Sequence, residues 1–187
     1  MKPNNTERLS FRMVTPADAE ALDALNRAPG VMKYLDRNPP TLELVRDQSI
    51  PEQQRIAQDF PGYGQWVATL NPTGEFVGWF ELEPNHPNPG DAEIGYRMRP
   101  DYWGQGLASE GARELLRYAF ETLSVARVAA ITMAVNTPSR RVMERIGLTH
   151  VRTFHEHFDD PLPGTEEGEV EYALTRDEWI VRHGLPE

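Results

Sequence analysis

A strand that runs through a double-glycine turn into a long helix most constrains what this chain can fold into. Residues 93–99 alternate polar and apolar, with Ile94, Tyr96 and Met98 as the apolar set, which is the period of a half-buried strand. Pro100 cannot donate to a sheet ladder and ends that strand. Over residues 107–123 the apolar and small side chains recur at steps of three and four. This spacing predicts one buried stripe of an α-helix.

Gly104 and Gly106 lie where the predicted helix begins. The first turn of a helix has N–H groups without intrahelical partners and carries the positive end of the helix dipole. Glycine lets a ligand approach the backbone directly, so the turn predicts a phosphate or pyrophosphate site. A helix that simply starts with Gly-Gln-Gly fits this fragment equally well. No P-loop lysine is present, and Ser109 replaces the third glycine of a dinucleotide fingerprint.

Length and charge exclude several classes of protein. The 187 residues suffice for one core, and we expect a single domain over residues 1–187. A net charge of −10 disfavours general binding to nucleic acid or to an anionic membrane. There is no cysteine, and no apolar run reaches the ~20 residues that span a bilayer. The N-terminus lacks the apolar core of a signal peptide, so a cytoplasmic protein is expected.

The remaining patterns predict a mixed α/β chain. A helix over residues 41–60 is expected to break or kink at Pro51 and to turn Leu44 and Phe60 inward. An exposed, proline-rich connection is expected over residues 83–90. Further strands are predicted at 8–14, 66–70, 75–82, 127–135, 148–158 and 170–175, and further helices after Thr15, over 137–146 and after Thr175.

Three segments carry a resemblance to a known family: Ala-Glu-Ile-Gly-Tyr at 92–96, Pro-Asp-Tyr-Trp-Gly-Gln-Gly-Leu-Ala-Ser-Glu at 100–110, and residues 136–148. Together with the element order they resemble the GNAT superfamily of N-acetyltransferases, and within it the RimJ/RimL-like branch that acetylates ribosomal-protein N-termini. The resemblance implies an α/β fold with a mixed central sheet whose central strands splay apart between flanking helices. It also implies transfer of an acetyl group from acetyl-CoA to a primary amine by direct attack on the thioester. The amine would be a protein N-terminus or a small molecule.

The resemblance places coenzyme A at the glycine turn. It implies that backbone amides bind the pyrophosphate, namely those of Gly104, Gln105, Gly106, Leu107, Ala108 and Ser109. Free backbone groups near Met98 and Arg99 would pair with the pantetheine arm, and one amide there would act as an oxyanion donor. Asn136 would hydrogen-bond the pantetheine, or would only end a strand. Asp101 departs from the family pattern and is expected to point away from the phosphates, and Tyr102 and Trp103 are expected to pack under the loop.

The catalytic residues follow from the same resemblance. Glu93 matches the glutamate that many members carry on this strand and is the candidate base, although an outward glutamate on an alternating strand fits nearly as well. Met143 occupies the place where many relatives have a tyrosine acid. Ser139 is the substitute acid, or only the cap of the helix at 137–146. This gap leaves open a second hypothesis, that of a non-catalytic coenzyme A-binding module.

Histidines and acids near the C-terminus allow weaker readings. His155, His157 and Asp159 would share one face of the predicted strand, but the family needs no metal and none is expected. Acidic pairs at 159–160 and 166–167 would suit a cationic acceptor, or are a solvated loop. From their placement in the implied fold, His155, Glu156, His157 and Asp159 could instead line the acceptor pocket together with Tyr34, Trp66 and Trp79. A monomer or homodimer is expected.

Overall fold

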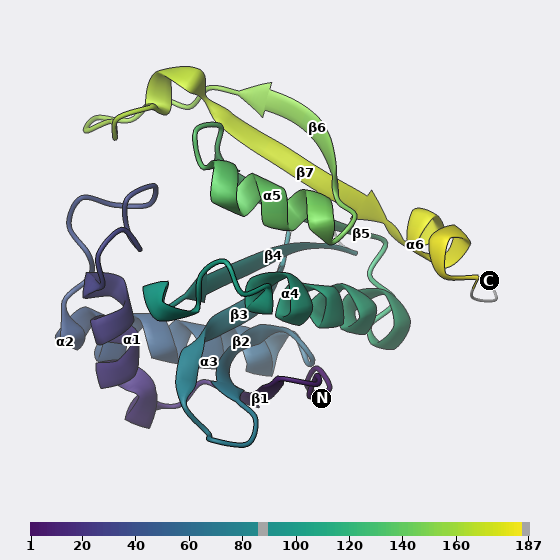
Figure 1. The fold of residues 1–187 in the computed structure, drawn as a ribbon, viewed down its shortest axis with the longest axis horizontal. Helices are drawn as coiled ribbons and strands as arrows, with labels where there is room; N and C mark the ends of the chain where they lie inside the picture. The colour runs from purple at the N-terminus through teal and green to yellow at the C-terminus, as the bar shows by residue number, and fades with distance from the viewer. Residues whose placement is uncertain (86–89, 185–187) are drawn as a thin grey trace.

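A computed structural model describes residues 1–85 and 90–184 and contains one seven-stranded sheet of order β1-β2-β3-β4-β5-β7-β6 (Figure 1). The strands are β1 (Leu9–Met13), β2 (Gly64–Leu70), β3 (Phe76–Pro84), β4 (Asp91–Met98), β5 (Arg127–Met133), β6 (Thr149–Phe154) and β7 (Glu169–Thr175). The helices are α1 (Ala19–Arg27), α2 (Leu42–Leu44), α3 (Ile50–Asp59), α4 (Leu107–Arg117), α5 (Thr137–Arg145) and α6 (Arg176–His183). The predicted mixed α/β architecture is confirmed.

The sheet is nearly divided in two between β4 and β5. Strands β1 to β4 form an antiparallel meander, and β5, β7 and β6 form a second antiparallel set. The two sets are joined by the parallel pairing of β4 with β5, which covers only residues 91–93 and 127–129. Beyond Glu93 and Ala129 the two strands have no register partner in each other. This splay is the feature that the family resemblance implies.

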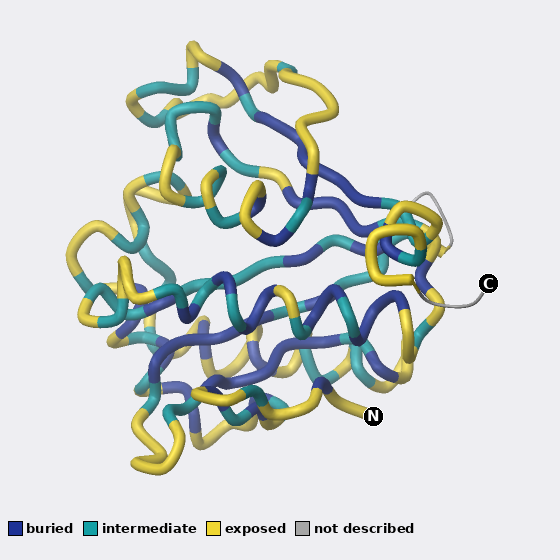
Figure 2. The backbone as a smooth tube through the Cα atoms, turned by 45° about the vertical axis from the view of Figure 1, so that its right-hand side comes forward, coloured by how far each residue is buried: buried dark blue, intermediate teal, exposed yellow. Residues whose placement is uncertain are grey.

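Each face of the sheet has its own core. On one face, Phe80, Ile94 and Met98 pack with Leu115 of α4 in the larger cluster of buried side chains. On the other face, Val67 and Trp79 pack against α1 and the segment around α3. Figure 2 shows the buried backbone following the central strands and the inner side of α4. Alternate residues of β3 and β4 therefore face different helices.

Helix starts follow the predicted caps. Thr41 Oγ1 accepts the Leu44 N–H at 3.2 Å, and Thr175 forms a capping box with Glu178. Thr15 pairs in the same way with Asp18 at a short 3₁₀ turn that leads into α1. The main helix after the glycine turn ends in a π-helical turn over Tyr118–Thr122. In the part of the chain that the structure describes, no helix combines the length and apolarity needed to cross a membrane.

Some local predictions differ from the structure. The expected break at Pro51 is a π-helical turn over Val45–Ser49, with Pro51 in the first turn of α3, where its missing N–H is tolerated. Leu44 and Phe60 were predicted to point inward but are 40% and 36% exposed. β6 ends at Phe154, four residues earlier than predicted. Of the connection predicted at 83–90, residues 86–89 lie outside the described residues, and Glu83 and Pro84 belong to β3.

Candidate active site

The glycine turn has the geometry that an anion site requires. Gly104 and Gly106 adopt φ values of 73° and 80°, which favour glycine strongly over residues with a Cβ. Gly106 is the N-cap of α4 and supplies no side chain, so the first-turn amides of Leu107, Ala108 and Ser109 have no capping oxygen. These amides lie at the positive end of an eleven-residue helix. The six residues predicted to bind the pyrophosphate are therefore brought together in one turn.

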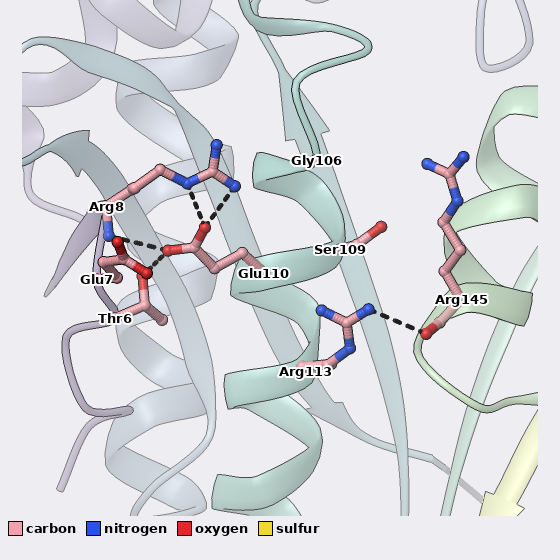
Figure 3. Close-up of a pocket in the computed structure, with 8 residues that line it drawn as sticks. All are labelled: Thr6, Glu7, Arg8, Gly106, Ser109, Glu110, Arg113 and Arg145. Carbon is pink, nitrogen blue, oxygen red and sulfur yellow. Dashed lines mark hydrogen bonds and ion pairs between the residues drawn. The ribbon is translucent and has the colours of Figure 1, made fainter.

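Arginines surround a cavity of about 430 Å³ beside this turn. Figure 3 shows Arg8 from the N-terminal segment, Arg113 from α4 and Arg145 from the end of α5 around it. Arg113 donates to the Arg145 carbonyl at 3.2 Å. Within the described ranges neither Arg113 nor Arg145 has a carboxylate within ion-pair distance. The cavity therefore offers two guanidinium groups whose charge is not neutralised by an acid.

Glu110, which also lines this cavity, is neutralised by its own partners. Its carboxylate accepts from Thr6 Oγ1 at 2.6 Å, from the Arg8 N–H at 2.9 Å and from Arg8 Nε at 2.6 Å. Burial would raise the pKa of Glu110, but these hydrogen bonds outweigh it and hold the pKa below its usual value. Arg8 also donates to the Gln105 carbonyl at 3.0 Å, which ties the N-terminal segment to the turn.

The backbone of β4 presents only alternate residues to the splayed gap. The Arg99 N–H donates to the Val77 carbonyl at 2.8 Å, so its amide faces β3. The prediction that this amide is free is therefore wrong. The antiparallel alternation then turns the N–H groups of Tyr96 and Met98 toward the gap. The Met98 carbonyl is also occupied, because Trp103 Nε1 donates to it at 2.8 Å. The free amides are therefore at Tyr96 and Met98.

The residues that precede the turn behave largely as expected. The Asp101 side chain points to solvent and accepts from Arg99 at 2.8 Å, while its carbonyl accepts from Gln105 Nε2 at 2.8 Å. Tyr102 packs against the larger core. Trp103 is 49% exposed, so only one of the two aromatic side chains lies under the loop.

Tyr96, which was not predicted as a site residue, extends from β4 to Ser139 on α5. Tyr96 Oη lies 3.1 Å from Ser139 Oγ and 3.1 Å from the Ser139 carbonyl, at the N-terminus of α5. Asn136 caps α5 through the Ser139 N–H at 3.4 Å and donates to Thr132 Oγ1 at 2.9 Å. Burial raises the pKa of Tyr96 to about 12, although its hydrogen bond to Ser139 lowers it slightly. Met143 is buried and supplies no hydroxyl. The alternation of β4 was the available signal, because it places Tyr96 on the face opposite Glu93.

Glu93 lies on the other face of β4, toward α1 and α3. It is directly opposite Glu83 of β3 and partly accessible to solvent. Burial first, and then the charges of Glu83 and Glu171, raise the pKa of Glu93 above its usual value. Gln53 of α3 donates to Glu83 at 2.6 Å. Glu93 is therefore one of several acids on a half-buried face.

Two loops that are far apart in the sequence are in contact. Arg37, in the segment after α1, donates to the Pro161 carbonyl and lies 3.5 Å from Asp160. This contact joins residues 28–41 to the acidic loop at 155–168.

The pocket assigned to Tyr34, Trp66 and Trp79 is wrong in part. Trp66 is fully buried and stacks edge-on against Tyr118 in the core on the α4 face, while Trp79 is buried on the opposite face beneath Arg97. Tyr34 is partly exposed and lies under the Lys33 ammonium.

The shared strand face of His155, His157 and Asp159 is also wrong, because all three lie beyond the end of β6. Among the described residues no group of three acids or histidines could hold a metal ion.

Known proteins resemble this chain in sequence and in fold. The sequence model of the family described as "Acetyltransferase (GNAT) domain" matches residues 8–149. The FsC-acetyl coenzyme A-N(2)-transacetylase of Aspergillus fumigatus is 43% identical over 183 residues, which cover 94% of this chain and 77% of that protein. YdaF of Bacillus subtilis, provisionally assigned as a ribosomal N-acetyltransferase, is 30% identical over 177 residues. This match covers 92% of this chain and 94% of YdaF. The crystal structure of a GNAT acetyltransferase from Bacillus anthracis matches with a TM-score of 0.76 at 28% identity, over 93% of this chain and 98% of that one.

Proposed function

This chain belongs to the GNAT acetyltransferase family and is an acetyl-CoA-dependent N-acetyltransferase, and we propose that its acceptor is a compact, cationic primary amine. The family assignment makes it an enzyme and replaces the hypothesis of a non-catalytic module. The observation that carries the proposal is that different chemical groups lie on the two sides of β4. Basic groups and free amides lie on the side of α4, and carboxylates lie on the side of α1 and α3.

Residues around the start of α4 would hold coenzyme A. The uncapped amides of residues 104–109 suit the pyrophosphate, and Arg113 and Arg145 suit a further phosphate. The Tyr96 and Met98 amides, which face the gap, suit the pantetheine arm and the thioester oxygen. Asn136, at the start of α5, is the further residue that we assign to the pantetheine. Arg99 contributes through its side chain, which orders the turn by its bond to Asp101.

The acetyl thioester supplies an activated carbonyl carbon that a neutral amine can attack. An amine with a pKa near 8–10 is mostly protonated at neutral pH, so a carboxylate must first accept a proton. We assign that task to the acids on the α1/α3 face, Glu93 among them. On the opposite side, Ser139 and Tyr96 form a hydroxyl pair that can give a proton to the leaving sulfur. Because the pKa of Tyr96 is raised to about 12, this tyrosine keeps its proton throughout the neutral range.

A compact, cationic acceptor is favoured by the name of one relative and by the charge of this chain. The 43% identical relative is named for transfer to an N(2) amine, which favours a small molecule. The net charge of −10 would attract a cationic amine over distances of about one Debye length.

A screen of small primary amines, with release of free coenzyme A thiol as the readout, tests this function. We expect acetylation of one or more di- or polyamines or amino-acid amides, and a loss of about 10²-fold or more in kcat in Glu93→Gln with coenzyme A affinity retained. Exposed Glu20→Gln on α1 is the matched control and should turn over normally. Turnover by no small amine would contradict the proposal.

The relationship to YdaF supports a second candidate acceptor, a protein N-terminus. Peptides with free and with blocked N-termini separate the two candidates, since only the free peptide could be acetylated at its α-amine. The cytoplasmic location and the monomeric or dimeric state stay predictions. Cell fractionation and analytical ultracentrifugation would test them.

A further inference from the structure

Glu81 occupies a notch in β4 that only a glycine leaves open. It lies on β3 directly opposite Gly95, between Glu93 and Arg97 on the neighbouring strand. A Cβ added to Gly95 would overlap the Glu81 carboxylate. The carboxylate therefore lies against the backbone of β4, in the space where a side chain would otherwise stand.

The position of Glu81 relative to the gap distinguishes it from Glu93. Glu93 pairs with Ala129 in the last register pair that joins β4 to β5, so it marks the closed end of the splay. Gly95 lies two residues further along β4, where β5 no longer follows it. The flanking residue Tyr96 presents its amide to the gap there. Glu81 is thus level with the open gap, while Glu93 is level with its closed end.

The surroundings of Glu81 bring the pKa of its carboxyl group close to neutral pH. Burial and the charges of Glu83 and Glu93 raise its pKa, Gln65 and Arg97 oppose the rise, and the pKa that results is about 7. Gln65 Nε2 donates to the carboxylate at 3.1 Å. The helices packed over this face present neutral amides, Gln53 of α3 to Glu83 and Asn26 of α1 to Arg97.

Two side chains that interact with Glu83 or Glu81 each have a buried polar atom without a partner. In the described part of the chain, Gln53 Oε1 and Arg97 Nε are buried with no hydrogen-bond partner. Gln53 holds Glu83, and Arg97 interacts with Glu81 through its charge. A buried polar atom without a partner is costly, so both atoms favour a hydrogen-bonding group or water in this space.

We propose that Glu81 is the principal carboxylate that takes the proton from the acceptor ammonium, with Glu93 as its neighbour at the closed end. The inference rests on the proposed N-acetyltransferase function. R–NH₃⁺ gives one proton to Glu81 and becomes R–NH₂. The C–N bond then forms and the C–S bond breaks. The second amine proton goes to the sulfur, and Glu81 returns its proton to water.

The test compares Glu81→Gln with Glu93→Gln and with exposed Glu52→Gln on α3. We expect Glu81→Gln to lower kcat/KM by about 10²-fold or more and to remove the acid limb of the pH profile near pH 7. Glu93→Gln should lower the rate while keeping that limb at a lower pH, because it removes a charge that raises the pKa of Glu81. Glu52→Gln should leave the profile unchanged.

Two further variants should move the acid limb of the pH profile in opposite directions while Glu81 itself is kept. Gln65→Met removes the hydrogen bond that stabilises the carboxylate, so the limb should move up by up to about 1 pH unit. Glu83→Gln removes a like charge, so the limb should move down. A carbon-13 NMR titration of the glutamate carboxyls without coenzyme A provides a readout independent of turnover. One resonance should titrate near pH 7 and disappear in Glu81→Gln.

The outcomes separate the two levels of the proposal. If no amine is acetylated by the wild-type enzyme, the proposed function fails. If amines are acetylated and a folded Glu81→Gln keeps both its rate and its acid limb, only the role of Glu81 is overturned. Should Glu81→Gln not fold, the opposite shifts in Gln65→Met and Glu83→Gln decide, and a limb that moves in neither variant refutes the assignment.

Discussion

At the scale of single residues, Gly95 is required for steric reasons rather than for its backbone angles. Gly95→Ala would place a methyl group on the Glu81 carboxylate. We expect a loss of about 1–3 kcal/mol in the free energy of unfolding, together with a fall in kcat/KM. Urea denaturation and steady-state kinetics measure the two effects.

The control for Gly95→Ala is a double variant. Glu81→Ala/Gly95→Ala removes the overlapping group, so it should be more stable than the sum of the single changes predicts. Strict additivity of the two changes would show that the methyl group does not meet the carboxylate.

Glu171 gives a prediction about pH and stability. It is almost fully buried on β7, 2.5 Å from Arg127 and 2.5 Å from Arg152. Burial would raise its pKa, but the two arginines outweigh burial and lower it. A lowered native pKa stabilises the fold above the unfolded pKa of about 4.3, and this contribution is lost as the pH falls through the native pKa.

Glu171→Gln tests this contribution. We expect the variant to lose about 1–3 kcal/mol at pH 7 relative to wild type, and the difference to shrink as the pH falls below about 4. Urea unfolding at pH 7, 5 and 3 measures it. A difference that stays constant over this range would contradict the role of the carboxylate charge.

At the scale of elements, the start of α4 sets the affinity for coenzyme A. Gly104→Ala forces a Cβ onto a φ of 73°, at a cost of roughly 1–2 kcal/mol, although the added atom would meet nothing within 4 Å. Because that strain tilts the amides of the turn, we expect about a tenfold or greater loss of coenzyme A affinity by calorimetry.

Gly74→Ala is the matched control for the turn. Gly74 has a φ of 74° in the turn between β2 and β3, and an added Cβ there also meets nothing within 4 Å. The strain is therefore the same, but the affinity for coenzyme A should not change. Equal losses in both variants would mean that the loss reflects general destabilisation rather than the amides of the turn.

Elements were more predictable than contacts. Caps such as Thr41 and Thr175, and the change of period after Gly106, act within a few residues, so the sequence reveals them. Leu44 and Trp66 were misplaced because the side of the sheet on which an apolar residue packs depends on neighbours far along the chain. Glu81 and Tyr96 escaped selection for the same reason, since Gly95 and Ser139 become their neighbours only in the folded sheet.

At the scale of the whole molecule, two half-sheets are held together by a ladder of three register pairs between β4 and β5. We expect coenzyme A to slow hydrogen exchange at the Tyr96 and Met98 amides, which face the gap. The amides of Gly95 and Arg97 bond toward β3 and should change little. Residue-resolved exchange by NMR, with and without coenzyme A, measures the pattern. Uniform slowing along β4 would contradict it.

The short ladder also sets a limit on how stable this enzyme can become. Each additional rung between β4 and β5 would bring two more backbone groups out of water and make the protein harder to melt. The same rung would close the slot in which the thioester arm is proposed to lie. Selection for heat resistance should therefore strengthen the two cores and the helix ends, and leave the splayed parts of β4 and β5 unpaired.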